Sequence, residues 1–434
     1  MRSIRGRGFR ELTLLGEALE LLERNVKRLP PQEVHLSQAG GRVLAEDVRA
    51  ERDSPPFSRA AMDGFAVRAS STFGASQSSP RYLRLREGEA RAGSGWQGVL
   101  GEGEAVRVST GAPLPEGADA VVMLEHVNVL GGEIEVLRAV PPGKNVALQG
   151  EDYRKGEVLL SAGRLLEARE LAVLASLGRA RVRVSTRPGV KVIATGDELA
   201  EPGEELGEGM VYEATGHALV HLCRSAGAEA ERVGIVEDSR EALEEALRAA
   251  AAQADVVLVT GASSVGEHDL VPEVFAELGR VLVHGIAMRP GEPTGFGRAG
   301  RALVFMLPGY PVATLFGFEA LVRPTLQLMQ GTPVNCPYPA VKAVLRRKIA
   351  SELGRRDFVR VRVSVGEGGF EAEPVRVSGS GVLSSMLRAD GFVVVPENTE
   401  GVEKGECVEV RLFAPLSGSC SGIKVKYAPA DNVG

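Results

Sequence analysis

Residues 190–198 read VKVIATGDE, an apolar run that ends in a threonine, a glycine and two acidic residues. The pattern returns at residues 255–261, which read DVVLVTG, and the apolar run Leu303–Leu307 is followed by the letters PGYP. Apolar strands that alternate with helices are typical of a parallel sheet with helices on both faces. Residues 187–335 therefore predict a central α/β domain whose strands end in loops of small residues.

The segments between these strands predict helices. One is expected over residues 213–225 and is followed by a glycine, which often ends a helix. A second is expected over residues 238–252, because Glu241 stands three residues after Asp238, as in a capping box. An apolar helix is expected over residues 312–328, directly after the third strand and its loop.

The remainder of the chain predicts three further domains and a tail. Apolar residues recur at helical spacing in residues 12–28 and 167–177, which indicates helices in these two segments. Elsewhere short β-type runs alternate with glycine and proline turns. The expected division is 1–50 with 150–186 as a discontinuous mixed helical/β domain, 51–149 as an inserted β-rich domain, 187–335 as the central domain, 336–416 as a C-terminal β domain and 417–434 as a polar tail.

Composition and charge exclude several classes of protein. The 434-residue chain has a formal net charge of −6, and its only basic cluster is Arg2–Arg10, so it lacks the basic stripe of a nucleic-acid binder. The longest uncharged stretch, Ala302–Phe318, is broken by prolines, so no membrane span is expected. The four cysteines are far apart, and no secretory signal precedes them. We therefore expect a cytoplasmic protein with reduced thiols.

The loops after the three apolar strands are the first candidate site. In an open parallel sheet the carboxyl ends of the strands share one edge, and ligands bind in the crevice there. Small residues at Thr195-Gly196, 260–266 and 308–311 would let backbone N–H groups approach a phosphate closely. The sequence thus predicts a phosphate or nucleotide site. The alternative is that these glycines only form tight turns between strand and helix.

Acidic residues in loops form a second constellation. Carboxylates beside a phosphate loop can hold Mg²⁺ between ligand oxygens. Taken singly, each could equally cap a helix or close an Asx turn. The residues are Asp63, Asp152, Asp197, Glu198 and Asp269.

Short motifs follow one another along most of the chain, from about residue 12 to residue 413. They are SPPF at 54–57, AMDGFAV at 61–67, TGAPLP at 110–115, GADAVV at 117–122, GED at 150–152, ATGDEL at 194–199, SVG at 264–266, MRPG at 288–291, LPG at 307–309 and GSGVLSS at 379–385. With these motifs in this order, the chain resembles the MoeA/gephyrin family of molybdopterin molybdenumtransferases.

The resemblance implies a fold and an assembly. It implies an α/β multidomain chain whose central parallel-sheet domain is similar to molybdopterin adenylyltransferases. An inserted β domain, a mixed helical/β segment and a C-terminal β barrel complete this expected architecture. It also implies an elongated homodimer, with the active cleft between the central domain of one subunit and the Met-Asp-Gly domain of the other. A molybdopterin adenylyltransferase is a candidate partner enzyme.

The resemblance further implies a reaction and a set of site residues. The family combines adenylylated molybdopterin with molybdate, for which tungstate is an alternative, and uses Mg²⁺ to yield molybdenum cofactor and AMP. By position, the catalytic acids are Asp63, Asp152, Glu198 and Asp269, of which Asp63, Glu198 and Asp269 hold the metal. The pterin nucleotide is expected at Thr110, Thr195, Gly196, Asp197, Gly261, Ser264, Gly266, Pro308 and Gly309. The oxyanion is expected at Ser264, Arg289, Arg355, Arg360 and Ser380.

Four motifs differ from the family's usual letters. Residues 213–215 read Glu-Ala-Thr for Asp-Ser-Asn, Ala262 changes a Gly-Gly-Val-Ser loop, and Tyr310 replaces the asparagine of Pro-Gly-Asn-Pro. The family's Lys-Pro-Gly-Lys-Pro reads Arg-Pro-Gly-Glu-Pro at residues 289–293. Arg289 keeps the first positive charge, whereas Glu292 replaces the second with a negative charge. Because an anion is expected here, the carboxylate of Glu292 would repel it. Two hypotheses follow: a transferase with a remodelled oxyanion site, or a divergent paralogue that binds the pterin nucleotide without inserting metal, as carrier, scaffold or regulator.

Overall fold

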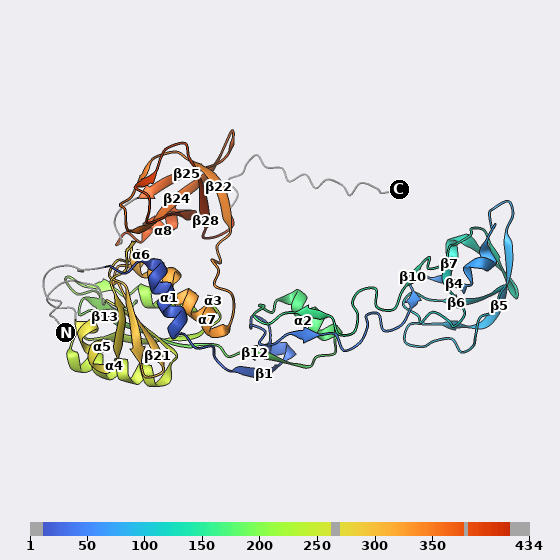
Figure 1. Cartoon of the computed structure of the whole chain (residues 1–434), viewed down its shortest axis with the longest axis horizontal. Coiled ribbons are helices and arrows are strands. Elements are labelled where there is room, and N and C mark those ends of the chain that lie inside the picture. The colour runs from blue at the N-terminus through green and yellow to red at the C-terminus, as the bar shows by residue number, and fades with distance from the viewer. Residues whose placement is uncertain (1–11, 262–269, 377–380, 417–434) are drawn as a thin grey trace. The chain divides into compact units, whose positions relative to one another are not determined.

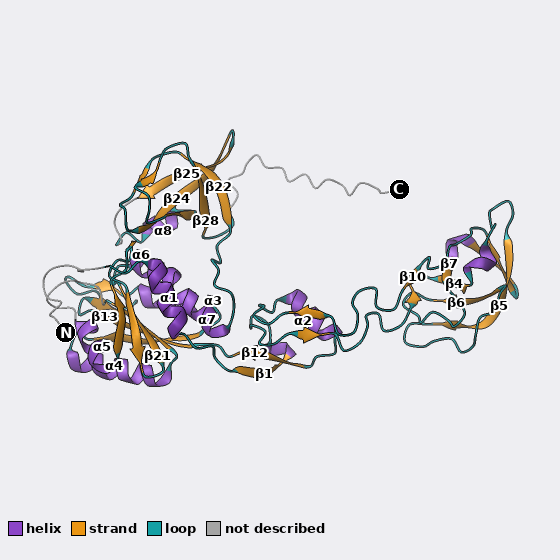
Figure 2. Ribbon diagram, in the orientation of Figure 1, coloured by secondary structure: helices purple, strands orange, loops and turns teal. Residues whose placement is uncertain are grey.

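The computed structural model describes residues 12–261, 270–376 and 381–416 (Figure 1). The chain divides into two compact units. Unit 1 comprises Met1–Val34, Gly41–Ala45 and Arg183–Gly434, and unit 2 comprises His35–Gly40 and Glu46–Val182. Strands occur throughout both units, whereas most helical residues belong to unit 1 (Figure 2). The finer domain boundaries expected from the sequence stay a prediction.

Unit 2 contains a six-stranded sheet with the strand order β7-β4-β6-β5-β9-β8. In β4, which lies between β7 and β6, Phe65 is 2% exposed, and Gly64 lies so close to β7 that a Cβ atom would be 2.0 Å from the carbonyl oxygen of Val122. The inserted β-rich region is therefore confirmed. The strands are β4 (Gly64–Val67), β5 (Arg81–Ala90), β6 (Glu104–Val108), β7 (Ala120–Met123), β8 (Val127–Leu130) and β9 (Glu133–Val136).

The helix of unit 2 is α2 (Ala168–Ser176), in the segment where the sequence predicts one. A capping box between Glu167 and Glu170 starts it. Burial opposes ionisation of Glu170, but hydrogen bonds from Arg164 and Arg169 and from backbone amides outweigh it and lower its pKa to about 2. This carboxylate ties the first turn of the helix to the preceding loop.

Unit 1 is built on a second six-stranded sheet, ordered β16-β13-β17-β21-β20-β18. The first four strands are parallel, as expected, whereas β20 runs antiparallel to both of its neighbours, β21 and β18, so the sheet is mixed. The sequence analysis missed β20 because its glycines conceal it: a Cβ atom on Gly297 would lie 2.3 Å from a carbonyl oxygen of β18. The strands are β13 (Gly189–Thr195), β16 (Glu229–Val236), β17 (Val256–Thr260), β18 (Arg280–His284), β20 (Gly295–Ala299) and β21 (Ala302–Leu307).

Helices cover both faces of this sheet (Figure 1). Alternate residues of each strand face opposite ways, so Leu258 packs towards α1 and α3, whereas Val257 packs towards α4 and α5. The expected start of α4 is wrong by one residue, because Ser239 rather than Asp238 accepts the capping hydrogen bond. The helices are α1 (Leu15–Asn25), α3 (Thr215–Ser225), α4 (Arg240–Gln253), α5 (Leu270–Leu278), α6 (Pro311–Gly317), the π-helical η4 (Phe318–Val322) and α7 (Arg323–Gln330).

The C-terminal part of unit 1 is a closed barrel. The order β24-β25-β22-β28-β26 closes through a pairing of β24 with β26, and β19 (Met288–Arg289) adds to β24 from outside. Phe316 of α6 stacks on Phe358 of the barrel with ring centroids 5.2 Å apart. The C-terminal β barrel that the resemblance implies is confirmed. The barrel strands are β22 (Ala340–Leu345), β24 (Arg356–Gly366), β25 (Gly369–Arg376), β26 (Gly391–Val395) and β28 (Cys407–Leu412).

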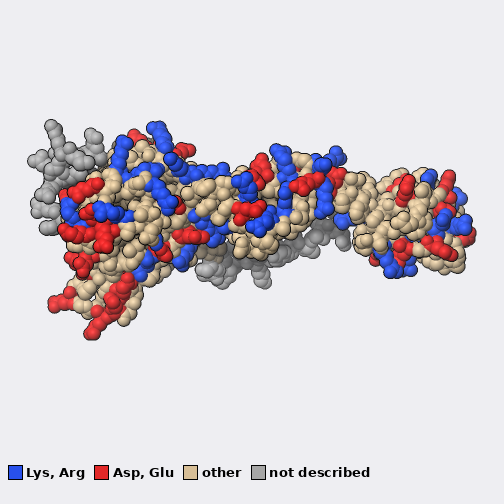
Figure 3. Space-filling view, turned by 90° about the horizontal axis from the view of Figure 1, so that it is seen from below, with Lys and Arg blue, Asp and Glu red and all other residues tan. Residues whose placement is uncertain are grey.

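Short elements connect these parts. They are β1 (Pro31–His35), β2 (Val48–Arg49), β3 (Arg59–Ala60), β10 (Val146–Ala147), β11 (Val158–Leu160), β12 (Arg181–Ser185), β14 (Leu199–Ala200), β15 (Val211–Tyr212), β23 (Ile349–Ala350), β27 (Gly401–Val402), α8 (Ser384–Arg388) and the helical turns η1 (Leu36–Gln38), η2 (Ala69–Thr72) and η3 (Leu124–His126). Among the described residues no helix is long and apolar enough to cross a membrane. On the face in Figure 3, basic and acidic side chains are interspersed rather than gathered into one basic stripe.

Candidate functional site

The three glycine loops meet at one edge of the central sheet. Thr260 pairs with Ala194 of β13 and with Leu307 of β21, so the three strands end side by side. Gly261 has a φ of +98°, and a Cβ atom there would lie 2.1 Å from the carbonyl oxygen of Thr195. A Cβ atom on Gly309 would lie 3.4 Å from the Cα atom of Gly261. The backbone at Thr195, Gly261 and Gly309 is therefore in close contact at this edge, which the absence of a side chain at position 261 permits.

The first loop is tied to the start of α4. The hydroxyl of Thr195 donates to Asp238, and the backbone amide of Asp238 donates to Asp197 over 3.1 Å. Gly196 has a φ of +151°, and a Cβ atom there would lie 2.6 Å from a carboxylate oxygen of Glu198. Glu198 itself is exposed. Asp197 is exposed too, so the loop presents two carboxylates to solvent beside its glycine.

The side chain of Glu213 is turned into the protein. Its side chain is 1% exposed, and Oε1 accepts hydrogen bonds from the hydroxyl of Thr215 (2.8 Å) and the amide of Gly216 (2.6 Å). Arg232 lies 2.9 Å from Oε2 and also donates twice to Glu201. Glu213 therefore caps α3 and is neutralised by an arginine, close to the edge where the loops meet.

Two of the arginines expected at the oxyanion converge on one buried carboxylate. Asp357 is 0% exposed; its Oδ2 accepts from Arg289 and from the hydroxyl of Ser351 (3.0 Å), and its Oδ1 accepts from Nε of Arg355 (3.0 Å). The parallel pairing of β19 with β24 sets Arg289 opposite Asp357. Arg360, the third expected arginine, is 3% exposed on β24. The sequence analysis gave Asp357 no role.

Arg289, Arg355 and Asp357 form an arginine cluster. The loop that follows Arg289 packs against the start of α6, which directly follows the third glycine loop. A Cβ atom on Gly291 would lie 3.5 Å from the carbonyl oxygen of Ala313 in α6. Tyr310, the residue before α6, is 62% exposed, and its ring carbons lie 3.2 Å from the Cβ position of Gly381. A barrel segment therefore approaches the third loop. Within the described chain, Glu292 is partly exposed and makes no ion pair.

In unit 2 the structure brings Asp63 and Thr110 together. Oδ1 of Asp63 accepts from the backbone amide (2.6 Å) and the hydroxyl (3.0 Å) of Thr110. These hydrogen bonds, the amide first, lower the pKa of Asp63, and the charge of Arg107 adds to the effect. Asp63 is exposed and ionised at neutral pH, and Oδ2 has no hydrogen-bond partner among the described residues. Asp152 is also exposed and accepts from the hydroxyl of Ser54 over 3.3 Å.

Three families match successive parts of the chain. They are described as the MoeA N-terminal region (domain I and II), over residues 14–178, a probable molybdopterin binding domain, over 191–328, and the MoeA C-terminal region (domain IV), over 342–413. A putative molybdopterin biosynthesis protein of Methanocaldococcus jannaschii is 40% identical and aligned over 91% of this chain and 94% of its own length. The molybdopterin molybdenumtransferase of Haemophilus influenzae is 34% identical over 94% of this chain and 100% of its own.

The chain belongs to the MoeA family.

A solved structure agrees with this assignment. The molybdopterin biosynthesis MoeA protein of Pyrococcus horikoshii OT3 is 37% identical, with a TM-score of 0.80 over 93% of this chain and 100% of that chain. The MoeA-like multidomain architecture and the C-terminal barrel are thereby confirmed, and the chain is a member of an enzyme family of molybdenum-cofactor biosynthesis.

Four of the residues expected at the MoeA site lie outside the described residues, namely Ser264, Gly266, Asp269 and Ser380, as does Ala262, which was named as a departure from the family's loop. Within the described residues, no three or more histidine, cysteine or acidic side chains are grouped so as to hold a metal ion. Asp63 belongs to unit 2, and Glu198 belongs to unit 1. The proposed Mg²⁺ ligands therefore stay a prediction.

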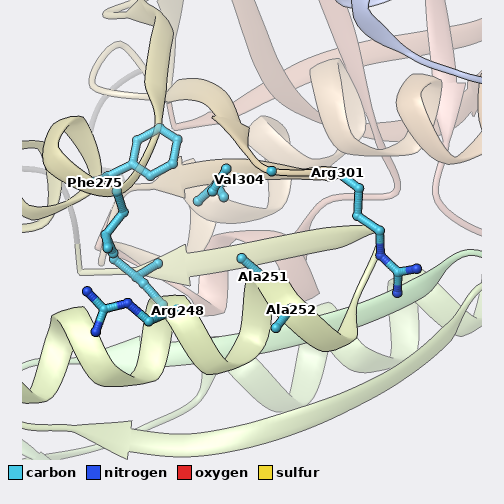
Figure 4. A pocket seen from close by; sticks show the side chains of 10 residues that line it. Arg248, Ala251, Ala252, Phe275, Arg301 and Val304 are labelled. Atoms are coloured by element: carbon cyan, nitrogen blue, oxygen red, sulfur yellow. The ribbon is translucent and has the colours of Figure 1, made fainter.

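A cavity of about 330 Å³ lies elsewhere in the central domain (Figure 4). It is enclosed by the later turns of α4, by α5 and by the turn into β21, at the end of the sheet away from the glycine loops. Phe275 and Val304 contribute apolar walls, and Arg248 and Arg301 are exposed beside it. None of the expected MoeA site residues within the described chain lines this cavity.

Proposed function

We propose that this chain inserts molybdate into adenylylated molybdopterin and releases AMP. One observation carries the proposal: the sheet edge where the glycine loops meet is joined, through the start of α6, to a cluster that contains Arg289 and Arg355. A phosphate-binding surface beside paired guanidinium groups suits a reaction between a nucleotide-linked pterin and an oxyanion. Family membership supports the same reaction.

The glycine loops would hold the pterin nucleotide. Gly196, Gly261 and Gly309 leave backbone groups without side-chain cover, so phosphate oxygens can approach the N–H groups. Thr195, Asp197 and Pro308 would shape this surface, together with Ser264 and Gly266. In the proposed homodimer, Thr110 of the partner subunit would contact the same ligand across the cleft.

The oxyanion would bind at the guanidinium groups. Charge-assisted hydrogen bonds from arginine to an oxyanion are shorter and stronger than neutral ones, and the planar guanidinium fits two oxygens at once. Arg289, Arg355 and Arg360 would provide this charge, with the hydroxyls of Ser264 and Ser380. Molybdate and tungstate share a tetrahedral shape and a double negative charge, so both would fit these donors.

Mg²⁺ would be held by Asp63, Glu198 and Asp269, and would neutralise charge on the phosphates as AMP leaves. The exposed carboxylates of Asp63 and Glu198 fit this role, because Mg²⁺ prefers oxygen ligands and keeps several waters. Asp152 would complete the acidic set. In the homodimer, Asp63 of the partner subunit would supply the ligand across the cleft. A cytoplasmic protein that receives its substrate from a molybdopterin adenylyltransferase fits this proposal.

A second candidate is a paralogue that binds the pterin nucleotide without inserting metal. Two features favour it. Glu292 is partly exposed and places a negative charge on the loop after Arg289. Glu213 is committed to Arg232 and to the cap of α3, so it is withdrawn from any ligand.

The deciding experiment measures AMP release from adenylylated molybdopterin by the purified chain with Mg²⁺, while molybdate or tungstate is titrated. Oxyanion-dependent release that is lost in Asp269→Ala, but kept in the matched surface variant Glu244→Gln, would support the transferase. Tight pterin-nucleotide binding without release would favour the paralogue, and Glu292→Lys would then be tested for restored release. Absence of binding would contradict both candidates. Light scattering tests the expected dimer.

A further inference from the structure

Asp357 lies where the barrel meets the loop from the central sheet. Its side chain is 1% exposed and receives hydrogen bonds from Arg289, Arg355 and Ser351. A buried carboxylate is tolerated only when it is paired and its oxygens are hydrogen-bonded, and both conditions hold here. This carboxylate is therefore a built feature of the site rather than an accidental surface pair.

The charges of the cluster explain why a carboxylate is needed. Two guanidinium groups brought close together repel each other, and each has a long side chain with many rotamers. Asp357 accepts from both, so it offsets the repulsion and fixes their orientation before any anion arrives. The two arginines and Asp357 together carry a net positive charge of one. Glu352, the further acid beside Arg355, is 73% exposed, so its charge is screened by water and the three residues still attract a dianion.

The arginines have donors left after they have bound Asp357. A guanidinium group carries five N–H donors. Arg355 gives Nε to Asp357 and Nη1 to the exposed Glu352 (3.2 Å), while its Nη2 is buried and has no hydrogen-bond partner among the residues that the structure describes. Arg289 uses Nη2 for Asp357 and is 32% exposed. A buried charged donor without a partner is costly, which indicates that a ligand completes it.

We propose that Asp357 is a positioning residue for the oxyanion. It holds Arg289 and Arg355 so that their remaining N–H groups face a tetrahedral dianion. This inference rests on the proposed function. It adds Asp357 to the residues that influence oxyanion binding, and Asp357 acts by holding the two arginines and not by contacting the oxyanion. Because β19 and β24 pair Arg289 directly with Asp357, the backbone register of the barrel sets the geometry of the site. Arginine suits position 289, since its fork can bind Asp357 and an anion together.

For Asp357→Asn, charge alone and the positioning role predict opposite changes in molybdate affinity. Asp357→Asn removes a negative charge, so charge alone would make a dianion bind more tightly. If Asp357 positions the arginines, the same substitution weakens molybdate binding by about tenfold or more, since small displacements of binding groups have large effects. The affinity for the pterin nucleotide should change little.

The test measures molybdate binding to the full-length protein by equilibrium dialysis, with thermal melting as a check on folding. Glu397→Gln is the matched control. Glu397 accepts two hydrogen bonds of 2.9 Å from Arg356, which precedes Asp357 in β24, but its side chain does not contact Arg289, Arg355 or Asp357. Ser351→Ala is a milder variant that removes one hydrogen bond to Asp357 without a change of charge. It should weaken binding by a few-fold and is informative even if Asp357→Asn fails to fold.

A double-mutant cycle tests whether Asp357 acts through its neighbour. In an Arg289→Ala background, Asp357→Asn should weaken binding less than it does in the wild type, because the two residues are coupled. Equal or tighter molybdate binding by Asp357→Asn would overturn the positioning role while leaving the proposed function intact. If Asp357→Asn does not fold, unchanged molybdate binding by Ser351→Ala would overturn the positioning role instead. If the wild type binds neither molybdate nor tungstate, the oxyanion step of the proposed function fails, and the positioning role fails with it.

Discussion

The contact between the first two glycine loops makes a quantitative prediction for Gly261→Ala. A Cβ atom at this position would lie 2.1 Å from the carbonyl oxygen of Thr195, against a practical minimum of 3.0 Å. Relief therefore requires a backbone displacement of about 1 Å, and such overpacking typically costs about 1–3 kcal/mol. The φ of +98° adds about 1–2 kcal/mol for a residue with a side chain. The substitution should destabilise unit 1 by about 2–5 kcal/mol.

Gly300→Ala is the matched control for this prediction. Gly300 also has a positive φ, of +58°, but no atom lies within 4 Å of its Cβ position. It should therefore lose only the backbone contribution, about 1–2 kcal/mol. For domains of 150–250 residues, 1 kcal/mol corresponds to about 2–4 °C in Tm. Scanning calorimetry should show a loss of about 4–20 °C for Gly261→Ala and about 2–8 °C for Gly300→Ala. Equal losses for the two variants would refute the contact between the loops.

Other predictions concern titration and reactivity. Because the folded pKa of Glu170 is lowered to about 2, its stabilising effect is complete above its ordinary pKa and is lost as pH falls towards 2. The Tm of Glu170→Gln should therefore lie below that of the wild type at neutral pH, and the two melting curves should converge in acid; a difference independent of pH would contradict this. Thr110→Val removes a hydroxyl donor, so the pKa of Asp63 should rise towards its ordinary value in an NMR titration. Burial raises the pKa of Cys223 to about 12, so it should resist iodoacetamide at pH 8 until the protein unfolds, as mass spectrometry would show.

Local sequence patterns were sufficient for the central strands. The apolar runs of β13, β17 and β21 have few polar residues to obscure them, and their order along the chain predicted adjacent loops. β20 was missed because it lacks an apolar run; its Gly-Phe-Gly start is explained only by the neighbouring backbone. Asp238 looked like a helix cap from its spacing to Glu241, but it instead binds Thr195 of a distant strand end.

The site was predictable only where residue types suggest chemistry. Resemblance assigned Arg289 and Arg355 to the oxyanion, and the structure places them on one carboxylate. Asp357 could not be predicted, because its contact with Arg289 joins residues 68 positions apart and arises from the pairing of β19 with β24. The inward turn of Glu213 likewise depends on Arg232, which approaches from another strand.

The stoichiometry of the reaction tests the proposed function most directly. Purified protein would be mixed with adenylylated molybdopterin, Mg²⁺ and molybdate, and both AMP and pterin-bound molybdenum would be quantified over time. We expect the two products to appear in equal amounts, and release of AMP to stop when molybdate is omitted. Release of AMP without molybdenum incorporation, at the same rate with and without molybdate, would contradict metal insertion by this chain.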